Sequence, residues 1–66
     1  MIYVQHDYHG IGVVRADYFD GHNDYVLVVE FFRKNGFVTE VVPALDCDEP
    51  TDEAVEKALG NTEEAA

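Results

Sequence analysis

The stretch from Tyr25 to Phe32, with the sequence YVLVVEFF, constrains the fold more than any other part of the chain. Its β-branched and aromatic residues strongly favour a strand. Alternate positions give two apolar faces, one with Leu27, Val29 and Phe31, the other with Val26, Val28 and Phe32 interrupted by Glu30. One face fits a core. The second face needs a partner, either from the rest of the chain or from another protein.

The length of 66 residues suits a single domain near the lower size limit for a core that folds without disulfides or metal. Apolar residues make up 47% of the chain, which is enough for a globular fold. Cys47 is the only cysteine, so no internal disulfide is possible and a cytoplasmic location is expected. No apolar run approaches the roughly 20 residues that span a bilayer, and residues 1–15 lack the pattern of an export signal. We therefore expect no membrane contact.

The net charge of −10 comes from 14 acidic and four basic side chains. Such a balance repels phosphate backbones, so direct nucleic-acid binding is disfavoured. The acids are unevenly placed: residues 1–45 hold six acids and three bases, whereas residues 46–66 hold eight acids and one base. The acidity therefore belongs mainly to the C-terminal segment.

Four strands are predicted from residue type and turn signals, at residues 2–6, 11–19, 25–32 and 37–42. Turn formers at residues 7–10 and 20–24 separate the first three strands. A short helix is predicted at about 51–59, with Thr51 as its N-cap and Gly60 at its end, and residues 61–66 are expected to be disordered. The fold class is mainly β: a small SH3/Tudor-like barrel of four or five antiparallel strands over residues 1–46, followed by an acidic tail with the helix over residues 47–66.

Three glycines are assigned structural roles in turns. Gly10 and Gly12 follow the first turn, where a positive φ or a close backbone approach is expected, and Gly36 ends the last hairpin turn. In the second strand, Val14 and Ala16 alternate with charged residues and are predicted to face the core. Leu45 is expected to fold back onto one end of the barrel.

The register of the last hairpin depends on its turn, Arg33-Lys34-Asn35-Gly36. A two-residue Asn35-Gly36 turn sets Glu40 opposite Phe31 in the core, where an unpaired carboxylate costs several kcal/mol. A three-residue loop with Gly36 in the left-handed region avoids that cost. It pairs Phe31 with Thr39 and Val29 with Val41, so that Glu30 and Glu40 face each other outward, and this register is the one predicted.

A family resemblance rests on a defined set of positions: His6 through Gly12, then Val14, the apolar alternation from Val26 to Phe31, Gly36 and Leu45. Together they resemble the small SH3/Tudor-like barrel that closes UvrD/PcrA-type helicases. The HDYHGIG stretch is also similar to the start of the RNA-polymerase-interacting domain shared by CarD-like regulators and the transcription-repair coupling factor. Both resemblances cover roughly residues 3–45. They imply a docking module instead of an enzyme, with contact to RNA polymerase through pairing at a sheet edge.

The sequence gives little support for a catalytic site or a metal site. His6, His9 and Cys47, with Asp7 nearby, lack the spacing of a zinc site, and a hydrogen-bonded turn histidine is the preferred interpretation. Asp46, Asp48 and Glu49 are expected to raise the pKa of Cys47 and suppress its thiolate. The remaining carboxylates are interpreted as solvated charges. No catalytic residue, metal or cofactor is predicted.

The apolar stripe opposite the core is the candidate site. It is predicted to comprise Val26, Val28, Phe32, Val38 and Val42, unless the C-terminal helix covers it with Val55 and Leu59. We expect Val26, Val28, Phe32 and Val38 to contact a protein partner, Glu30 and Glu40 to select a basic groove, and Arg33 to lie at the rim with Lys34. The partner expected from the resemblance is the transcription or DNA-repair machinery, such as the RNA polymerase β subunit.

Two other classes of function remain open. The first is an acidic inhibitor of phage or mobile-element type that imitates nucleic acid and occupies a basic cleft of a host protein. The second is a salt-adapted protein whose acidity serves solubility. The sequence leaves the oligomeric state open.

Overall fold

The computed structural model describes the backbone of residues 1–65 and the side chains of residues 1–60. The chain is mainly β with one C-terminal helix, as predicted. The strands are β1 (Tyr3–His6), β2 (Gly10–Phe19), β3 (Tyr25–Arg33), β4 (Gly36–Pro43) and the two-residue β5 (Cys47–Asp48), with a 3-10 turn η1 (Ala44–Asp46) and the helix α1 (Asp52–Ala65).

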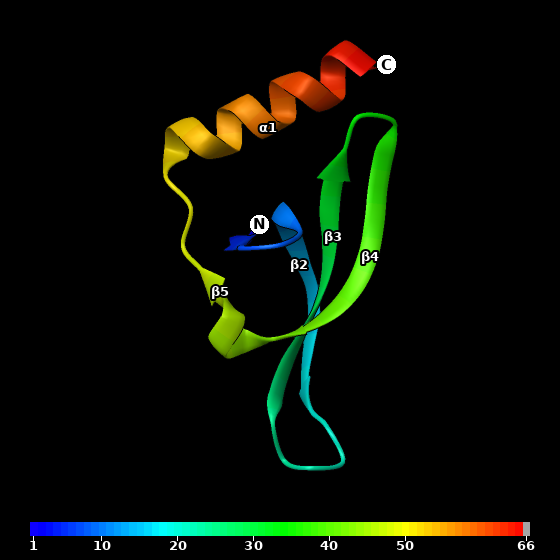
Figure 1. Ribbon diagram of the computed structural model, residues 1–66, viewed down its shortest axis with the longest axis vertical. Coiled ribbons are helices and arrows are strands. Elements are labelled where there is room, and N and C mark those ends of the chain that lie inside the picture. Colours follow the sequence, from blue (N-terminus) through cyan, green and yellow to red (C-terminus); the bar gives the residue numbers. More distant parts are fainter. Residues whose placement is uncertain (66) are drawn as a thin grey trace.

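The five strands form one antiparallel sheet in the order β4-β3-β2-β1-β5 (Figure 1). The chain leaves β4, turns through η1 and reaches β5 on the far side of β1, so β4 and β5 are the two edges. The sheet is therefore open, and the predicted closure into a barrel is not seen. A β5 of only two residues, paired with β1 alone, is too short to join the edges.

The main core cluster lies on one face of the sheet around β3, and Val13 and Val26 are buried on the other face. Phe31 and Val29 are fully buried, which agrees with the prediction for that face of YVLVVEFF. The rest of the cluster consists of Val4, Leu27 and Val42, with Val14, Val38, Ala44 and Cys47 packed against it.

Gly12 is the position in β2 where a side chain would collide with β3. A Cβ built there lies 2.6 Å from the Glu30 carbonyl oxygen and 2.9 Å from the Phe31 Cα. Only glycine fits such a contact without moving backbone. Gly10 differs, since its φ of 87° lies in the left-handed region and no neighbour crowds it. The two glycines of the GIG motif therefore serve different needs.

A β-bulge at Arg15 corrects the prediction for the second strand. The register with β3 shifts between Val14 and Ala16, so Val14 pairs with Val29 on the core face and Ala16 pairs with Val28 on the other. Ala16 is exposed, not buried. The extra residue reverses the alternation of all later side chains in β2. Arg15 itself reaches Glu30 in a salt bridge.

The register of the β3–β4 hairpin also differs from the prediction. Arg33 pairs with Gly36 around a two-residue loop, Lys34-Asn35, and Gly36 has a φ of 133°. Phe31 therefore pairs with Val38, not with Thr39. The predicted outward pair of Glu30 with Glu40 is wrong: Val29 pairs with Glu40, which stays exposed because β4 is an edge strand.

The segment after β4 gives two further corrections. Leu45 points into solvent and is 98% exposed, whereas Ala44 packs on the core in its place. Thr51 caps α1 as predicted, accepting a hydrogen bond from the Ala54 amide at 3.1 Å. Gly60 does not end the helix, which continues to Ala65. The expected disorder of residues 61–66 is thus wrong for the backbone to 65, and residue 66 lies outside the described residues.

Candidate interaction site at the open edge of the sheet

β4 is an edge strand of eight residues that, within residues 1–65, pairs with β3 alone. Its register with β3 runs from Arg33–Gly36 to Val26–Pro43 without a bulge. Long edges in soluble proteins are usually blunted by bulges, by inserted Lys or by proline. Here Pro43 stands only at the far end, and Glu40 is the one charged residue of the strand. An unprotected edge therefore runs from Gly36 to Val42.

The direction of the backbone groups along this edge follows from the pairing. Arg33 and Gly36 close a two-residue loop, and in such hairpins the closing pair is hydrogen bonded. Bonded and non-bonded pairs then alternate, so the N–H and C=O groups of Phe37, Thr39 and Val41 point away from β3. Pro43 follows the same alternation as Phe37, Thr39 and Val41, so its backbone nitrogen also points away from β3. Proline has no N–H to donate to β3, which agrees with this assignment. Three consecutive outward positions are free to pair with another strand.

The side chains of those positions lie on the sheet face opposite the core. Phe37 and Val41 are each 52% exposed, and Thr39 between them is also exposed. The ring of Phe37 packs on the ring of Phe32, with centroids 5.3 Å apart. The centroids of the Phe32 and Tyr3 rings are 6.2 Å apart. We call Phe37, Thr39 and Val41, with their outward backbone groups, the β4 edge. It combines hydrogen-bonding capacity with exposed apolar surface.

The β3 residues of the predicted stripe lie on the sheet face opposite the core cluster, but the predicted β4 residues do not. Val38 and Val42 lie on the core face, where Val42 is buried and Val38 packs against the cluster. The side chains on the stripe side are Phe37 and Val41, which the one-residue error in register exchanged for Val38 and Val42. The observed register has Lys34-Asn35 as its loop, which neither of the two registers considered from the sequence has, and it places Phe37 and Val41 on this face.

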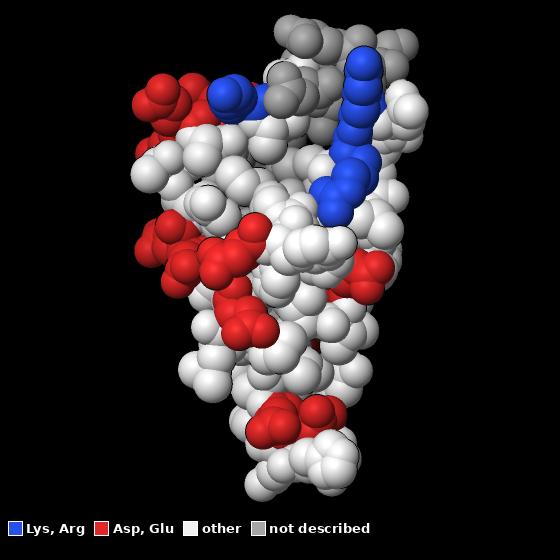
Figure 2. Space-filling view, viewed as in Figure 1, with Lys and Arg blue, Asp and Glu red and all other residues white. Residues whose placement is uncertain are grey.

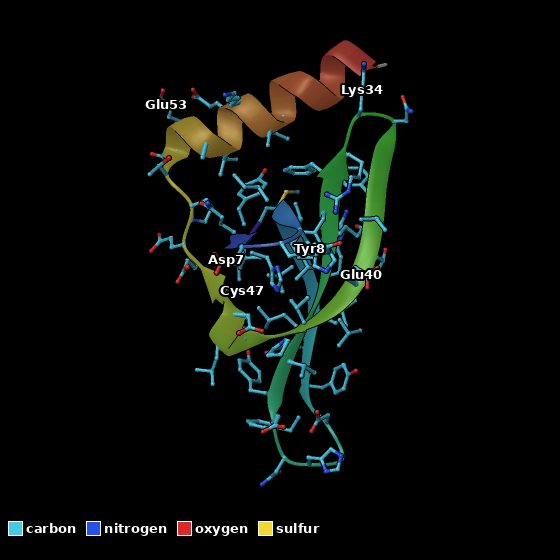
Figure 3. All side chains as sticks on the ribbon, in the orientation of Figure 1. Asp7, Tyr8, Lys34, Glu40, Cys47 and Glu53 are labelled. Carbon is cyan, nitrogen blue, oxygen red and sulfur yellow. The ribbon has the colours of Figure 1, made fainter. Side chains whose placement is uncertain are left out.

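Most of the other predicted site residues are buried or make contacts within the chain. Val26 is buried and Val28 and Phe32 are half-buried. Glu30 is paired with Arg15. The guanidinium of Arg33 donates to the His9 and Phe32 carbonyls at 2.9 and 2.8 Å, so it ties the first turn to β3. Glu40 remains free beside β4, and Lys34 extends from the hairpin turn (Figure 3).

Among the described residues, Phe37, Thr39 and Val41 of the β4 edge stay exposed in the presence of the helix. α1 packs against β3 and β2, and its Val55 and Leu59 are half-buried. Figure 1 shows it crossing one end of the sheet, near the N-terminus. Phe37 and Val41 remain half exposed with the helix in place.

The histidine-rich turn has a structural role. Nδ1 of His6 accepts hydrogen bonds from the amides of Tyr8 and His9, at 3.1 and 3.2 Å. The His9 ring stacks on Phe31 with centroids 4.9 Å apart. Within the described residues no group of three or more His, Cys, Asp or Glu side chains is placed to hold a metal ion.

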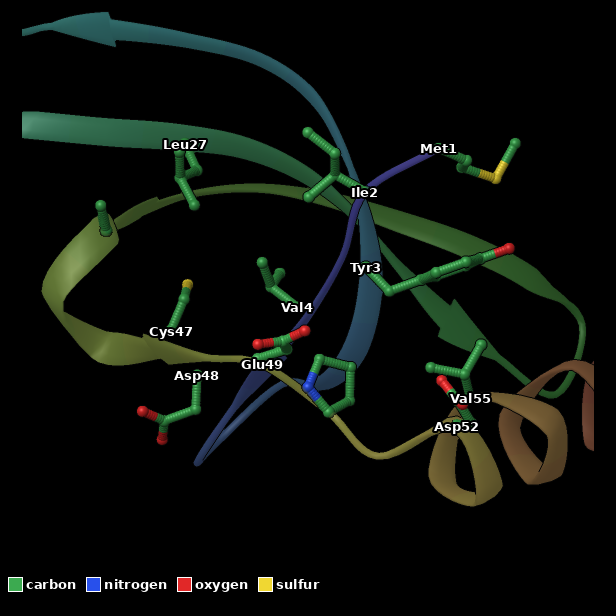
Figure 4. A pocket seen from close by; sticks show the side chains of 12 residues that line it. Met1, Ile2, Tyr3, Val4, Leu27, Cys47, Asp48, Glu49, Asp52 and Val55 are labelled. Atoms are coloured by element: carbon green, nitrogen blue, oxygen red, sulfur yellow. The ribbon is translucent and has the colours of Figure 1, made fainter.

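A shallow hollow of about 540 Å³ lies where β1, β5 and the start of α1 meet (Figure 4). Its walls are largely apolar, with Ile2, Val4 and Leu27 on one side and Val55 on the other. Asp48, Glu49 and Asp52 stand at its rim and are exposed. Carboxylates in open solvent are not held as the dry acid–base pair that catalysis needs.

Cys47 lies beside this hollow as a half-buried thiol whose Sγ is 3.7 Å from the Pro43 carbonyl oxygen. Burial raises the pKa of the Cys47 thiol above its ordinary value, and the charges of Asp46 and Asp48 raise it further. The predicted direction is confirmed, but the largest cause is burial, and Glu49 is not among the causes.

A raised pKa leaves less thiolate at a given pH, and the thiolate is the nucleophile. At pH 8 we expect iodoacetamide to alkylate Cys47 more slowly than free cysteine, with a half-maximal rate at a higher pH. Asp48→Asn should speed the reaction, whereas Glu49→Gln should leave it unchanged. The measurement is the alkylation rate by mass spectrometry, and a rate equal to that of free cysteine would contradict the assignment.

The charges are distributed unequally between the two edges of the sheet. In Figure 2, acidic side chains crowd the side of β5 and the start of α1, with smaller acidic groups beside β4 and near the β2–β3 loop, and basic side chains lie on α1 and towards the β3–β4 turn. None of the helices in the described part of the chain is long and apolar enough to cross a membrane. Comparisons with protein-family models, with curated proteins and with solved structures find no match.

Proposed function

We propose that the chain is a non-enzymatic protein-interaction module that binds an extended segment of a partner as an additional strand beside β4. The observation that carries this proposal is the unprotected β4 edge, with three outward backbone positions and two half-exposed apolar side chains. Strand addition of this kind takes its affinity from main-chain hydrogen bonds and its specificity from alternate side chains.

The partner we propose is the transcription or DNA-repair machinery, with the RNA polymerase β subunit as the first candidate. Its basis is the resemblance of residues 3–45 to the polymerase-interacting domain of CarD-like regulators, which implies pairing at a sheet edge. The fold agrees with that resemblance only in being a small, mainly β domain of five antiparallel strands and one helix. Glu40, exposed beside the edge, favours a partner strand that carries basic residues.

The test is the binding of the purified β subunit of a bacterial RNA polymerase to three chains: wild type, Thr39→Pro and Thr39→Ala. Both variants lose the hydroxyl, but only Thr39→Pro loses the outward amide N–H. We expect Thr39→Ala to bind like wild type and Thr39→Pro to bind at least about tenfold more weakly, a loss of about 1.4 kcal/mol or more. The measurement is calorimetry or biolayer interferometry.

Three results would contradict the proposal. One is the absence of binding by the wild type. The second is equal binding by Thr39→Pro. The third is an affinity that falls steeply with salt and is abolished by free DNA, because that behaviour belongs to an acidic imitation of nucleic acid.

A further inference from the structure

The β4 edge has an order of residues that is complementary to itself. If two copies of the edge run antiparallel about a two-fold axis at Thr39, Phe37 of each copy faces Val41 of the other, and Thr39 faces Thr39. Aromatic–β-branched and Thr–Thr pairs are among the favourable cross-strand pairs. All three positions have outward backbone groups, so each of these pairs is a hydrogen-bonded one.

The other sheet face accepts the same arrangement. Val38 of one copy lies opposite Glu40 of the other, so the two Glu40 carboxylates do not face each other directly but are diagonal neighbours on this face. The strand continues without a bulge from Gly36 to Val42, and Pro43 lies outside the paired stretch.

Electrostatics favour this edge over the other. β4 carries one acid, Glu40, whereas acidic side chains crowd β5 and the start of α1, towards the opposite edge of the sheet (Figure 2). The antiparallel arrangement also brings the Arg33–Lys34 turn of each copy towards the end of β4 in the other copy, where Asp46 follows. Repulsion between two chains of net charge −10 is therefore smallest when they meet at β4.

We propose that two copies of this chain pair through β4, antiparallel and centred on Thr39, and that this pair competes with the partner strand for the same edge. The competition rests on the function proposed above; the self-pairing does not. A seven-residue strand spans only about 24 Å, and the interface it makes is smaller than the ~1,600 Å² of a standard stable one. The dimer is therefore weak and dissociates on dilution, which leaves the edge free for a tighter partner.

Cysteine cross-linking tests the two-fold axis directly. In a Cys47→Ser background, Thr39→Cys places two thiols on facing residues with Cα atoms about 5.5 Å apart, within the range of a disulfide. Val41→Cys is the matched control, because each Val41 faces Phe37 of the other copy and the two Val41 positions lie roughly 14 Å apart along the strand. Both replaced side chains are exposed, so both variants should fold.

Under oxidised glutathione we expect Thr39→Cys to give a covalent dimer and Val41→Cys to remain monomeric. Sedimentation velocity of the wild type should show a monomer that becomes a dimer with concentration, and Thr39→Pro should stay monomeric. The proposal is overturned if Val41→Cys cross-links as readily as Thr39→Cys, or if Thr39→Cys does not cross-link at millimolar concentration.

Polymerase binding separates this inference from the proposed function. The disulfide-linked Thr39→Cys dimer should not bind the β subunit, and reduction should restore binding. If the chain never dimerises but still binds in a manner sensitive to Thr39→Pro, only the self-pairing is wrong. If it cross-links at Thr39 but the wild type binds no β subunit, the proposed function fails and the self-pairing stands. A linked dimer that binds as well as the monomer refutes the competition.

Discussion

Replacing Gly12 by alanine is expected to remove much of the stability of the domain. The added Cβ lies 2.6 Å from both the Glu30 carbonyl oxygen and the Val29 Cγ1, and 2.9 Å from the Phe31 Cα. Two of these three atoms are backbone, so β2 and β3 must move apart. We expect a loss of about 3 kcal/mol or more, out of the ~3–10 kcal/mol typical of a domain of this length.

Gly21→Ala is the matched control for this substitution. Gly21 lies in the β2–β3 loop, its φ is not in the left-handed region, and no atom lies within 4 Å of a Cβ built there. Urea denaturation followed by circular dichroism measures both variants. The close approach of β2 and β3 at Gly12 would be refuted if the two alanine variants had the same unfolding midpoint.

Proline in β4 should act in opposite ways at two adjacent positions. The register assigns the Glu40 amide to the ladder with Val29, which is fully buried. Glu40→Pro removes that donor and leaves a buried carbonyl unsatisfied, at a cost of about 1–3 kcal/mol, and its ring also crowds β3. Thr39→Pro loses only an outward N–H, as Pro43 does, and should keep the fold.

Thermal and urea unfolding of the two proline variants, with Glu40→Ala and Thr39→Ala as side-chain controls, measures this difference. We expect Glu40→Pro to be largely unfolded at 25 °C and Thr39→Pro to unfold cooperatively near the wild-type midpoint. The reverse order of stability would mean that the hairpin is shifted by one residue.

Four of the five strands were predictable because residue type and turn formers mark them locally, whereas the two-residue β5 carries no such signal. YVLVVEFF, the DGHND loop and Pro43 place the elements to within one or two residues of their observed ends. The bulge at Arg15 was not predictable, since Arg15 and Ala16 fit a regular alternating strand equally well. Its effect is non-local: it depends on how β2 matches β3 around the contact at Gly12.

The candidate site depends on the register of one hairpin, and the charge of Glu40 predicts the wrong register. A residue of an edge strand can face the core side of the sheet without being buried. Glu40 faces the same side as Val29 yet remains in water. A shift of one residue then exchanged Val38 and Val42 for Phe37 and Val41.

Amide hydrogen exchange along β4 tests the central claim, that this strand offers an open edge to a partner. It is measured by NMR on the wild type, diluted until sedimentation shows a monomer. We predict that the amides of Phe37, Thr39 and Val41 exchange at least about tenfold faster than those of Val38, Glu40 and Val42, because only the second set is bonded to β3. Slow exchange at Phe37, Thr39 and Val41 in the monomer would contradict the account.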